Sequence, residues 1–232
     1  MKETHFMFAK KTILFIFAHM DDETISSYGT IRKMADAGAN VILYCICGAG
    51  RMTLSDTYTL KHHNQRTETF HEFRLSKYIN KSDCTYQNDL SLTPKSVQTI
   101  FNNAISKYKP DIVVTHWSGD LHFEHRLLGE ASLVACRCVL GSSIKQLWHV
   151  SSPVSKWSYG QTNGGFMPNL FIDTSKYKNE KLEMLHKYTG VELPIDNNDL
   201  RSADSIIKYD ELNGHVIGVD TAEAYIKVFE VI

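Results

Sequence analysis

The sequence predicts an α/β fold in which a mostly parallel β-sheet carries helices on both faces. Strand-like and helix-like segments alternate through the first two-thirds of the 232 residues, as they do in sheets built from strand–helix–strand units. Continuous apolar runs, such as TILFIF over 12–17, suit strands that are buried on both sides. Hydrophobic residues make up 43% of the chain and charged residues 22%, which is ordinary for a protein with a full core.

The first two predicted strands enclose a predicted helix. Lys11–His19 and Val41–Cys47 are β-rich apolar runs, so both are expected to be strands. Between them, Asp22–Ala37 has apolar residues at helical spacing. Gly38 stands where a glycine commonly follows the end of a helix.

Prolines mark the next elements. Leu60–Tyr78 is predicted to be helical. Pro94 suits the first turn of another helix, which is expected to run to about Tyr108. Pro110 ends that helix, and Asp111–Trp117 is predicted to be the third strand.

The remaining elements are less regular. The sequence predicts a helix over His125–Leu140, strands over Gln146–Ser151 and Asn169–Thr174, a helix over Lys176–Tyr188, a loop over Val191–Leu200 and a closing helix over Ala222–Phe229. The length suits one domain, and no repeat or linker divides the chain. We therefore expect a single domain over residues 1–232.

Charge and apolar length argue against several classes of protein. A net charge of −1, from 25 basic and 26 acidic residues, gives no reason to expect a nucleic-acid or membrane partner. The apolar run Ile13–Ala18 is far shorter than the ~20 residues that span a bilayer, and no secretory signal is expected. The five cysteines form no Cys-x-x-Cys pair, which favours reduced thiols in a cytoplasmic protein. The sequence leaves open whether the protein is a homo-oligomer.

Two clusters of metal-ligand residues follow predicted strands. The first strand runs into His19–Glu23, and the third runs into the segment from His116 to His125. Ligands of parallel sheets bind at the carboxyl ends of the strands, so both clusters are expected at one site. A catalytic zinc ion takes three nitrogen or oxygen ligands at ~2.0–2.2 Å and keeps a position for water. His19, Asp22 and His125 would supply these ligands.

Alternatives remain for each cluster. Asp22 would also suit a helix N-cap, and the pair His122 and His125 would also suit a solvent-exposed helix start. Iron in place of zinc is equally compatible with such a donor set. His116 would either support the ligands or be an ordinary buried core histidine. The aromatic residues of 148–166 would either stack on a sugar or pack within a loop.

Two further residues suit acid–base chemistry. A metal lowers the pKa of its bound water to about 7, so the carboxylate of Asp21 would suffice to take that water's proton. His122 lies three residues before His125 and would share its cavity. As an imidazolium, it would donate to a developing oxyanion or pass a proton to a leaving amine.

The two clusters resemble the signatures of the PIG-L/LmbE-like deacetylases. Ala18–Glu23 (AHMDDE) resembles the family's Ala-His-Pro-Asp-Asp-Glu, and His122–His125 (HFEH) resembles its His-Pro-Asp-His. Four further segments are similar to the family: Gly48–Gly50, Arg66–Glu68, Asn88–Leu90 and Gly218–Tyr225. The sequence departs from the family's pattern at Met20, Phe123, Glu124 and Thr221, none of which is an expected ligand.

The resemblance implies a Rossmann-like α/β fold and a zinc-dependent hydrolase acting on amide C–N bonds. It assigns the metal ligands to His19, Asp22 and His125, the general base to Asp21, the acid or oxyanion stabiliser to His122, and substrate contacts to Arg66 and Asp89. For Arg66 the alternative is a solvated helix charge, and for Asp89 it is a turn residue.

Three functions are compatible with these residues. The first is removal of an N-acetyl group from an N-acetylglucosamine-like amino sugar of a small-molecule or glycan pathway. The second is cleavage of another N-acyl group from an aminoglycoside, nucleoside-sugar or sugar-thiol intermediate. The third is a non-catalytic Rossmann-like binding module. No Gly-x-Gly-x-x-Gly follows the first strand, which argues against a dinucleotide-binding enzyme.

Overall fold

A computed structural model describes residues 7–19, 21–46, 81–84, 92–155, 165–190 and 193–232. Seven strands within these ranges form one sheet in the order β3-β2-β1-β4-β5-β7-β6. They are β1 (Thr12–Phe17), β2 (Asn40–Cys45), β3 (Lys81–Cys84), β4 (Ile112–His116), β5 (Gln146–Val150), β6 (Leu170–Asp173) and β7 (Ala222–Glu230). Neighbours from β3 to β5 pair in parallel, whereas β7 is antiparallel to β5 and β6. The predicted α/β fold with a mostly parallel sheet is confirmed.

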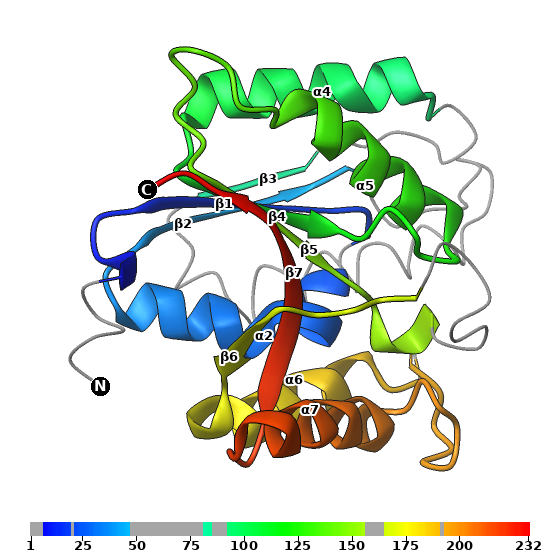
Figure 1. The fold of residues 1–232 in the computed structure, drawn as a ribbon. Helices are drawn as coiled ribbons and strands as arrows, with labels where there is room; N and C mark the ends of the chain where they lie inside the picture. The colour runs from blue at the N-terminus through cyan, green and yellow to red at the C-terminus, as the bar shows by residue number, and fades with distance from the viewer. Residues whose placement is uncertain (1–6, 20, 47–80, 85–91, 156–164, 191–192) are drawn as a thin grey trace.

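Helices cover both faces of this sheet (Figure 1). They are α2 (Asp22–Asp36), α4 (Pro94–Tyr108), α5 (Phe123–Ala135), α6 (Lys178–Tyr188) and α7 (Ala203–Ile217), with short 3₁₀ turns at Pro153–Ser155 and Ser175–Tyr177. Helices α4 and α5 lie on one face, and α2, α6 and α7 lie on the other. Strand β1 sends Ile13, Phe15 and Phe17 into one apolar cluster, and Leu14 and Ile16 into another. This two-sided burial explains the unbroken apolar run.

Residues at helix ends correctly predicted where α4 begins and where α2 ends. Pro94 stands at the start of α4, and the Thr93 side chain accepts a hydrogen bond from the Ser96 N–H at 3.1 Å, as part of a capping box. Beyond α2, Gly38 adopts φ +83°, which a residue with a side chain rarely does. The predicted helix over Leu60–Tyr78 lies outside the described residues.

The closing segment is a strand, so the prediction of a helix over Ala222–Phe229 was wrong. Alanine and glutamate at its start favour a helix locally. However, β7 hydrogen-bonds to a neighbour on each side, and Tyr225 enters the core beneath α2. Pairing with two strands outweighs the weak local preference, which is a common outcome for strands.

Other element boundaries also differ from expectation. Helix α5 begins two residues before His125 and ends at Ala135 rather than Leu140. Leu140 is fully exposed, and Gly141 at φ +83° turns the chain toward β5. Helix α7 and strand β3 were not predicted from the sequence. Among the described helices, none has the length and apolar character needed to cross a bilayer.

Candidate metal centre

The two clusters meet at the carboxyl ends of β1 and β4, which are neighbours in the sheet. His19 follows β1, and Asp22 is the first residue of α2. His116 is the last residue of β4, and His125 lies in the first turn of α5. Because β1 and β4 run parallel, the segments that leave them share one edge of the sheet.

The three residues predicted as ligands are in mutual contact. His19 Nδ1 lies 3.2 Å from Asp22 Oδ2, and His125 Nε2 lies 3.2 Å from Asp22 Oδ1. The two histidines approach within 3.3 Å, from His125 Nε2 to His19 Nδ1. Ligand atoms around a tetrahedral zinc with bonds of ~2.05 Å are separated by about 3.3 Å. The spacing of these atoms therefore fits a shared ion.

Burial and hydrogen bonding argue against the simpler alternatives. Asp21, not Asp22, stands at the N-cap position of α2, and its side chain makes no capping bond. Asp22 is 3% exposed, and its Oδ2 accepts the His19 N–H at 2.7 Å. His125 is 2% exposed, which excludes a solvent-facing helix start for that residue.

His116 contacts two of the predicted ligands, which is the placement expected for one of the two roles considered for it. Its Nε2 lies 3.2 Å from Asp22 Oδ2 and 3.1 Å from the Ala18 nitrogen. Its ring stacks on that of His125 at 3.8 Å with an interplanar angle of 8°. Two overlapping groups around the predicted ligands also have ligand atoms close enough to hold an ion: His19, His122 and His125, and Asp22, His116 and His125. His116 and His122 are thus additional candidate ligands.

Asp120 is a site residue that the sequence analysis missed. It is 2% exposed, and its Oδ2 lies 3.4 Å from His125 Nδ1. Its Oδ1 accepts the His122 N–H at 2.9 Å. A carboxylate behind a metal-binding imidazole fixes the tautomer and orientation of the ring. The signal available in the sequence was an acidic residue two positions before His122.

The charges of the centre fit a cation. Burial alone would lower the pKa of His125, but Asp22 and Asp120 outweigh it and raise the pKa to about 10. Burial opposes the charged form of Asp22, yet His125 and His116 hold the pKa of its carboxyl well below the ordinary range. Without a metal, a proton on His125 balances the buried carboxylates. A bound divalent ion would supply this positive charge in place of the proton. The nitrogen and oxygen atoms around the centre are donors that suit zinc.

His122 lies beside this centre with its own carboxylate. Its ring centroid is 4.8 Å from that of His19, and its Nδ1 lies 2.8 Å from Glu124 Oε2. Burial, with repulsion from His125 and His19, lowers the pKa of His122. A neutral imidazole is therefore favoured at pH 7 in the metal-free protein. A neutral ring still donates one N–H and can take up a proton during a reaction.

Only some of the other residues predicted from the sequence lie within the described part of the chain. Asp21 is 9% exposed at the start of α2. Burial lowers the pKa of His19, but Asp22 outweighs this effect and raises the pKa, and Asp21 adds a smaller contribution in the same direction. Arg66, Asp89 and the Gly48–Gly50 segment lie outside the described residues. Of the aromatic segment, Trp148 is a core residue that is 2% exposed.

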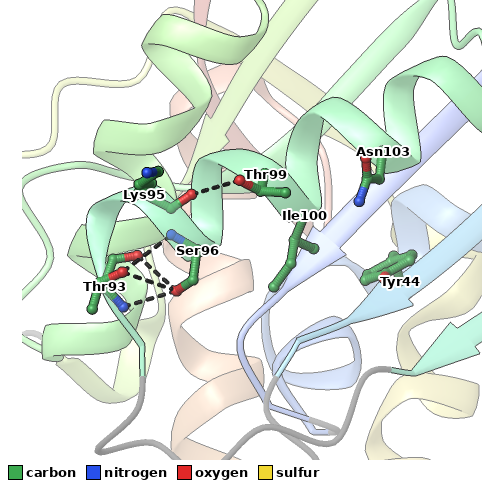
Figure 2. Close-up of a pocket in the computed structure, with 7 residues that line it drawn as sticks. All are labelled: Tyr44, Thr93, Lys95, Ser96, Thr99, Ile100 and Asn103. Carbon is green, nitrogen blue, oxygen red and sulfur yellow. Dashed lines mark hydrogen bonds between the residues drawn. The ribbon is translucent and has the colours of Figure 1, made fainter.

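A separate cavity of about 510 Å³ lies between β2 and the first half of α4. Figure 2 shows its lining residues, which are Tyr44, Thr93, Lys95, Ser96, Thr99, Ile100 and Asn103. Thr93 and Ser96 already bond to each other in the α4 capping box. None of the predicted site residues in the described part of the chain lines this cavity.

Comparison with protein families gives one assignment. The model of the family described as GlcNAc-PI de-N-acetylase, PIG-L, matches residues 14–136. This range contains both clusters and every residue of the candidate centre.

Several solved structures share the fold. N,N′-diacetylchitobiose deacetylase from Pyrococcus horikoshii is 19% identical with a TM-score of 0.74, over 94% of this chain and 84% of that one. The zinc-inhibited form of teicoplanin deacetylase Orf2 is 14% identical with a TM-score of 0.69, over 93% and 98%. GalB, a 4-carboxy-2-hydroxymuconate hydratase from Pseudomonas putida, is 15% identical with a TM-score of 0.69, over 96% and 98%. Because one of these is a hydratase, the shared fold alone does not select a reaction.

Proposed function

The chain belongs to the PIG-L family of de-N-acetylases, and from this premise we propose that it is a zinc-dependent hydrolase that removes the N-acetyl group of an N-acetylglucosamine-like amino sugar. The family match and the deacetylases among the similar structures support an N-deacetylase. The observation that carries the proposal is the mutual contact of His19, Asp22 and His125 at one edge of the sheet.

His19, Asp22 and His125 would hold the metal, with His116 and Asp120 fixing their orientation. When bound, a divalent ion supplies Lewis-acid chemistry, polarising water and the acyl carbonyl. Zinc is the proposed ion because the family resemblance implies it, and two imidazoles with one carboxylate form a known catalytic zinc site. The zinc-inhibited state named for the teicoplanin deacetylase supports a metal in a protein of this fold.

The chain's own residues would then divide the proton transfers. Asp21 accepts a proton from the water as its oxygen adds to the acyl carbon. His122 would act as an imidazolium, with its Nδ1–H facing Glu124 and its other N–H donating to the carbonyl oxygen as negative charge develops there. The amide C–N bond breaks as the departing nitrogen takes the proton that Asp21 accepted, which releases the free amine and acetic acid, and the acid ionises to acetate.

The acyl group and the sugar are the open part of this proposal. Arg66 and Asp89 would contact the sugar, as the family resemblance implies. An aminoglycoside, nucleoside-sugar or sugar-thiol intermediate with another N-acyl group is the second candidate, since the same atoms would cleave any accessible amide. The proposal also includes a cytoplasmic location, which is supported by the free thiols of Cys136 and Cys138.

The direct test is release of the free amine from a panel of N-acyl amino sugars by the wild-type protein and the Asp21→Asn variant. We expect the variant to bind zinc as the wild type does while kcat falls by about 10²–10⁴, because the general base is lost. Asp36→Asn, the same substitution at the other end of α2, serves as the matched control. A fully active Asp21→Asn variant would exclude Asp21 as the base, and a wild-type protein that is inactive on the whole panel would favour the non-catalytic alternative.

A further inference from the structure

Helix α2, which carries Asp21 at its N-cap and Asp22 in its first turn, is buried although much of its sequence is polar. Every residue from Asp22 to Arg32 is buried. The buried residues of this helix include Thr24, Ser26, Ser27 and Thr30. Apolar contact is non-directional, whereas hydrogen bonds fix both distance and direction. The polar contacts of α2 therefore decide where its first turn lies.

The carboxylate of Glu223, on β7, contacts the backbone in the middle of α2. Its Oε1 accepts the Gly29 N–H at 3.0 Å, and its Oε2 accepts the Thr30 N–H at 2.8 Å. Two adjacent N–H groups on one carboxylate fix the helix along its axis and in rotation. Tyr225, on the same side of β7, adds a hydrogen bond from its hydroxyl to Ser27 Oγ at 3.1 Å.

Two other helices contribute to a buried ion-pair network around Glu223. Glu223 is 1% exposed, and Lys181 of α6, itself 2% exposed, places Nζ 2.8 Å from Glu223 Oε1. The same Nζ lies 2.6 Å from Asp210 Oδ2 on α7. A buried carboxylate is costly unless it is paired and hydrogen-bonded, and here it is both.

The close approach at Gly29 strengthens the contact. A Cβ built on Gly29 would lie 2.5 Å from Thr174 Cβ. Only glycine therefore allows this turn of α2 to pack so closely against Thr174. The helix is therefore fixed by Thr174 on one side of this turn and by Glu223 at the amides.

We propose that Glu223 is a positioning residue for the metal centre. By accepting the Gly29 and Thr30 amides, it fixes the register of α2 and thereby the places of Asp21 and Asp22, about two turns away along a rigid helix. The inference rests on the proposed function, because it takes Asp22 to be a metal ligand. It also gives a physical reason for the segment Gly218–Tyr225, in which Glu223 and Tyr225 both bond to α2.

The test is the zinc dissociation constant of Glu223→Gln, measured by competition with a chromogenic chelator. The glutamine side chain keeps one oxygen but turns an NH₂ group toward either the Gly29 or the Thr30 N–H. Because two donors then face each other, we expect α2 to shift and zinc affinity to fall by about tenfold or more. Val97→Ala, in the core beneath α4 on the other face, is the control for lost stability. It should lower the unfolding temperature while the zinc dissociation constant stays within about twofold of wild type.

A second variant separates positioning from charge balance. Adding Lys181→Met and Asp210→Asn to Glu223→Gln leaves no charged group in this buried network. The triple variant should still bind zinc weakly, because one of the two amides still lacks its side-chain acceptor. In the metal-free single variant, hydrogen exchange at the Gly29 and Thr30 amides should also be faster than in wild type.

Two results would overturn the inference while leaving the proposed function intact. One is a Glu223→Gln variant that binds zinc as tightly as Val97→Ala does. The other is a triple variant that regains wild-type zinc affinity, because charge balance alone would then explain the loss. A wild-type protein that binds no zinc would instead overturn the proposed function, and this inference with it.

Discussion

Single residues in the candidate centre are held by contacts that join distant parts of the chain. Asp22 contacts His19 from its own segment, His116 from the end of β4 and His125 from the segment that follows it. The sequence predicted His19, Asp22 and His125 because each residue type is a zinc ligand and each lies in one of the two segments where a predicted strand leads into a helix. It did not predict Asp120, because that role depends on which side chain comes to lie behind His125, and spacing alone does not specify this.

Asp120→Asn tests this support at the residue scale. The variant keeps an oxygen for the His122 N–H but loses the charge beside His125 Nδ1, so zinc affinity should fall by about 10- to 100-fold. The measurement is isothermal titration with zinc. The matched control is Asp111→Asn. Asp111 lies at the amino-terminal ends of β1 and β4, far along these strands from the centre, and its Oδ2 accepts the Thr12 N–H. Equal affinity in the two variants would remove Asp120 from the support of the centre.

At the scale of elements, prediction succeeded where local chemistry sets the ends. Pro94 and the Thr93 cap start α4 at the expected residue, and Gly38 follows α2 as expected. Prediction failed for β7, where pairing with β5 and β6 outweighs helical propensity at Ala222 and Glu223. The expected helix over Leu60–Tyr78 and the substrate contacts Arg66 and Asp89 remain predictions, since they lie outside the described residues.

The packing of α6, α7 and β7 predicts a pH dependence of stability. Burial, with repulsion from Glu223, outweighs the attraction of Lys181 and raises the pKa of Asp210 to about 7. The folded state thus keeps a proton that the unfolded chain releases near its ordinary pKa of about 4. The stability that this proton contributes is complete below about pH 4 and is lost as pH rises to about 7.

Asp210→Asn should remove that dependence, because the amide does not titrate. Urea unfolding of the wild type and the variant at pH 5 and pH 8 measures it. The free energy of unfolding of the wild type, relative to the variant, should be lower at pH 8 than at pH 5. A difference that is the same at both values would contradict the raised pKa.

At the scale of the whole molecule, the centre joins segments that leave β1 and β4 and enter helices on opposite faces of the sheet. Asp22 begins α2 on one face, and His125 lies in α5 on the other (Figure 1). An ion bound by both would therefore hold the two layers together. Binding to the folded state alone stabilises it by about 2.7 kcal/mol when the free ligand is at 100 times its dissociation constant.

Thermal unfolding with and without zinc tests this linkage. The unfolding temperature of the wild type should rise with added zinc and fall with a chelator, whereas His125→Ala should respond to neither. His186→Ala, at an exposed histidine of α6, should respond as the wild type does. An undiminished zinc response in His125→Ala would place the ion elsewhere.

The most direct measurement is anomalous X-ray diffraction at the zinc absorption edge, from crystals of the zinc-loaded protein. We predict one strong peak within ~2.0–2.2 Å of His19 Nδ1, one carboxylate oxygen of Asp22 and His125 Nε2. A peak bound by other residues, or no peak at these three side chains, would contradict the shared metal centre on which the deacetylase proposal depends.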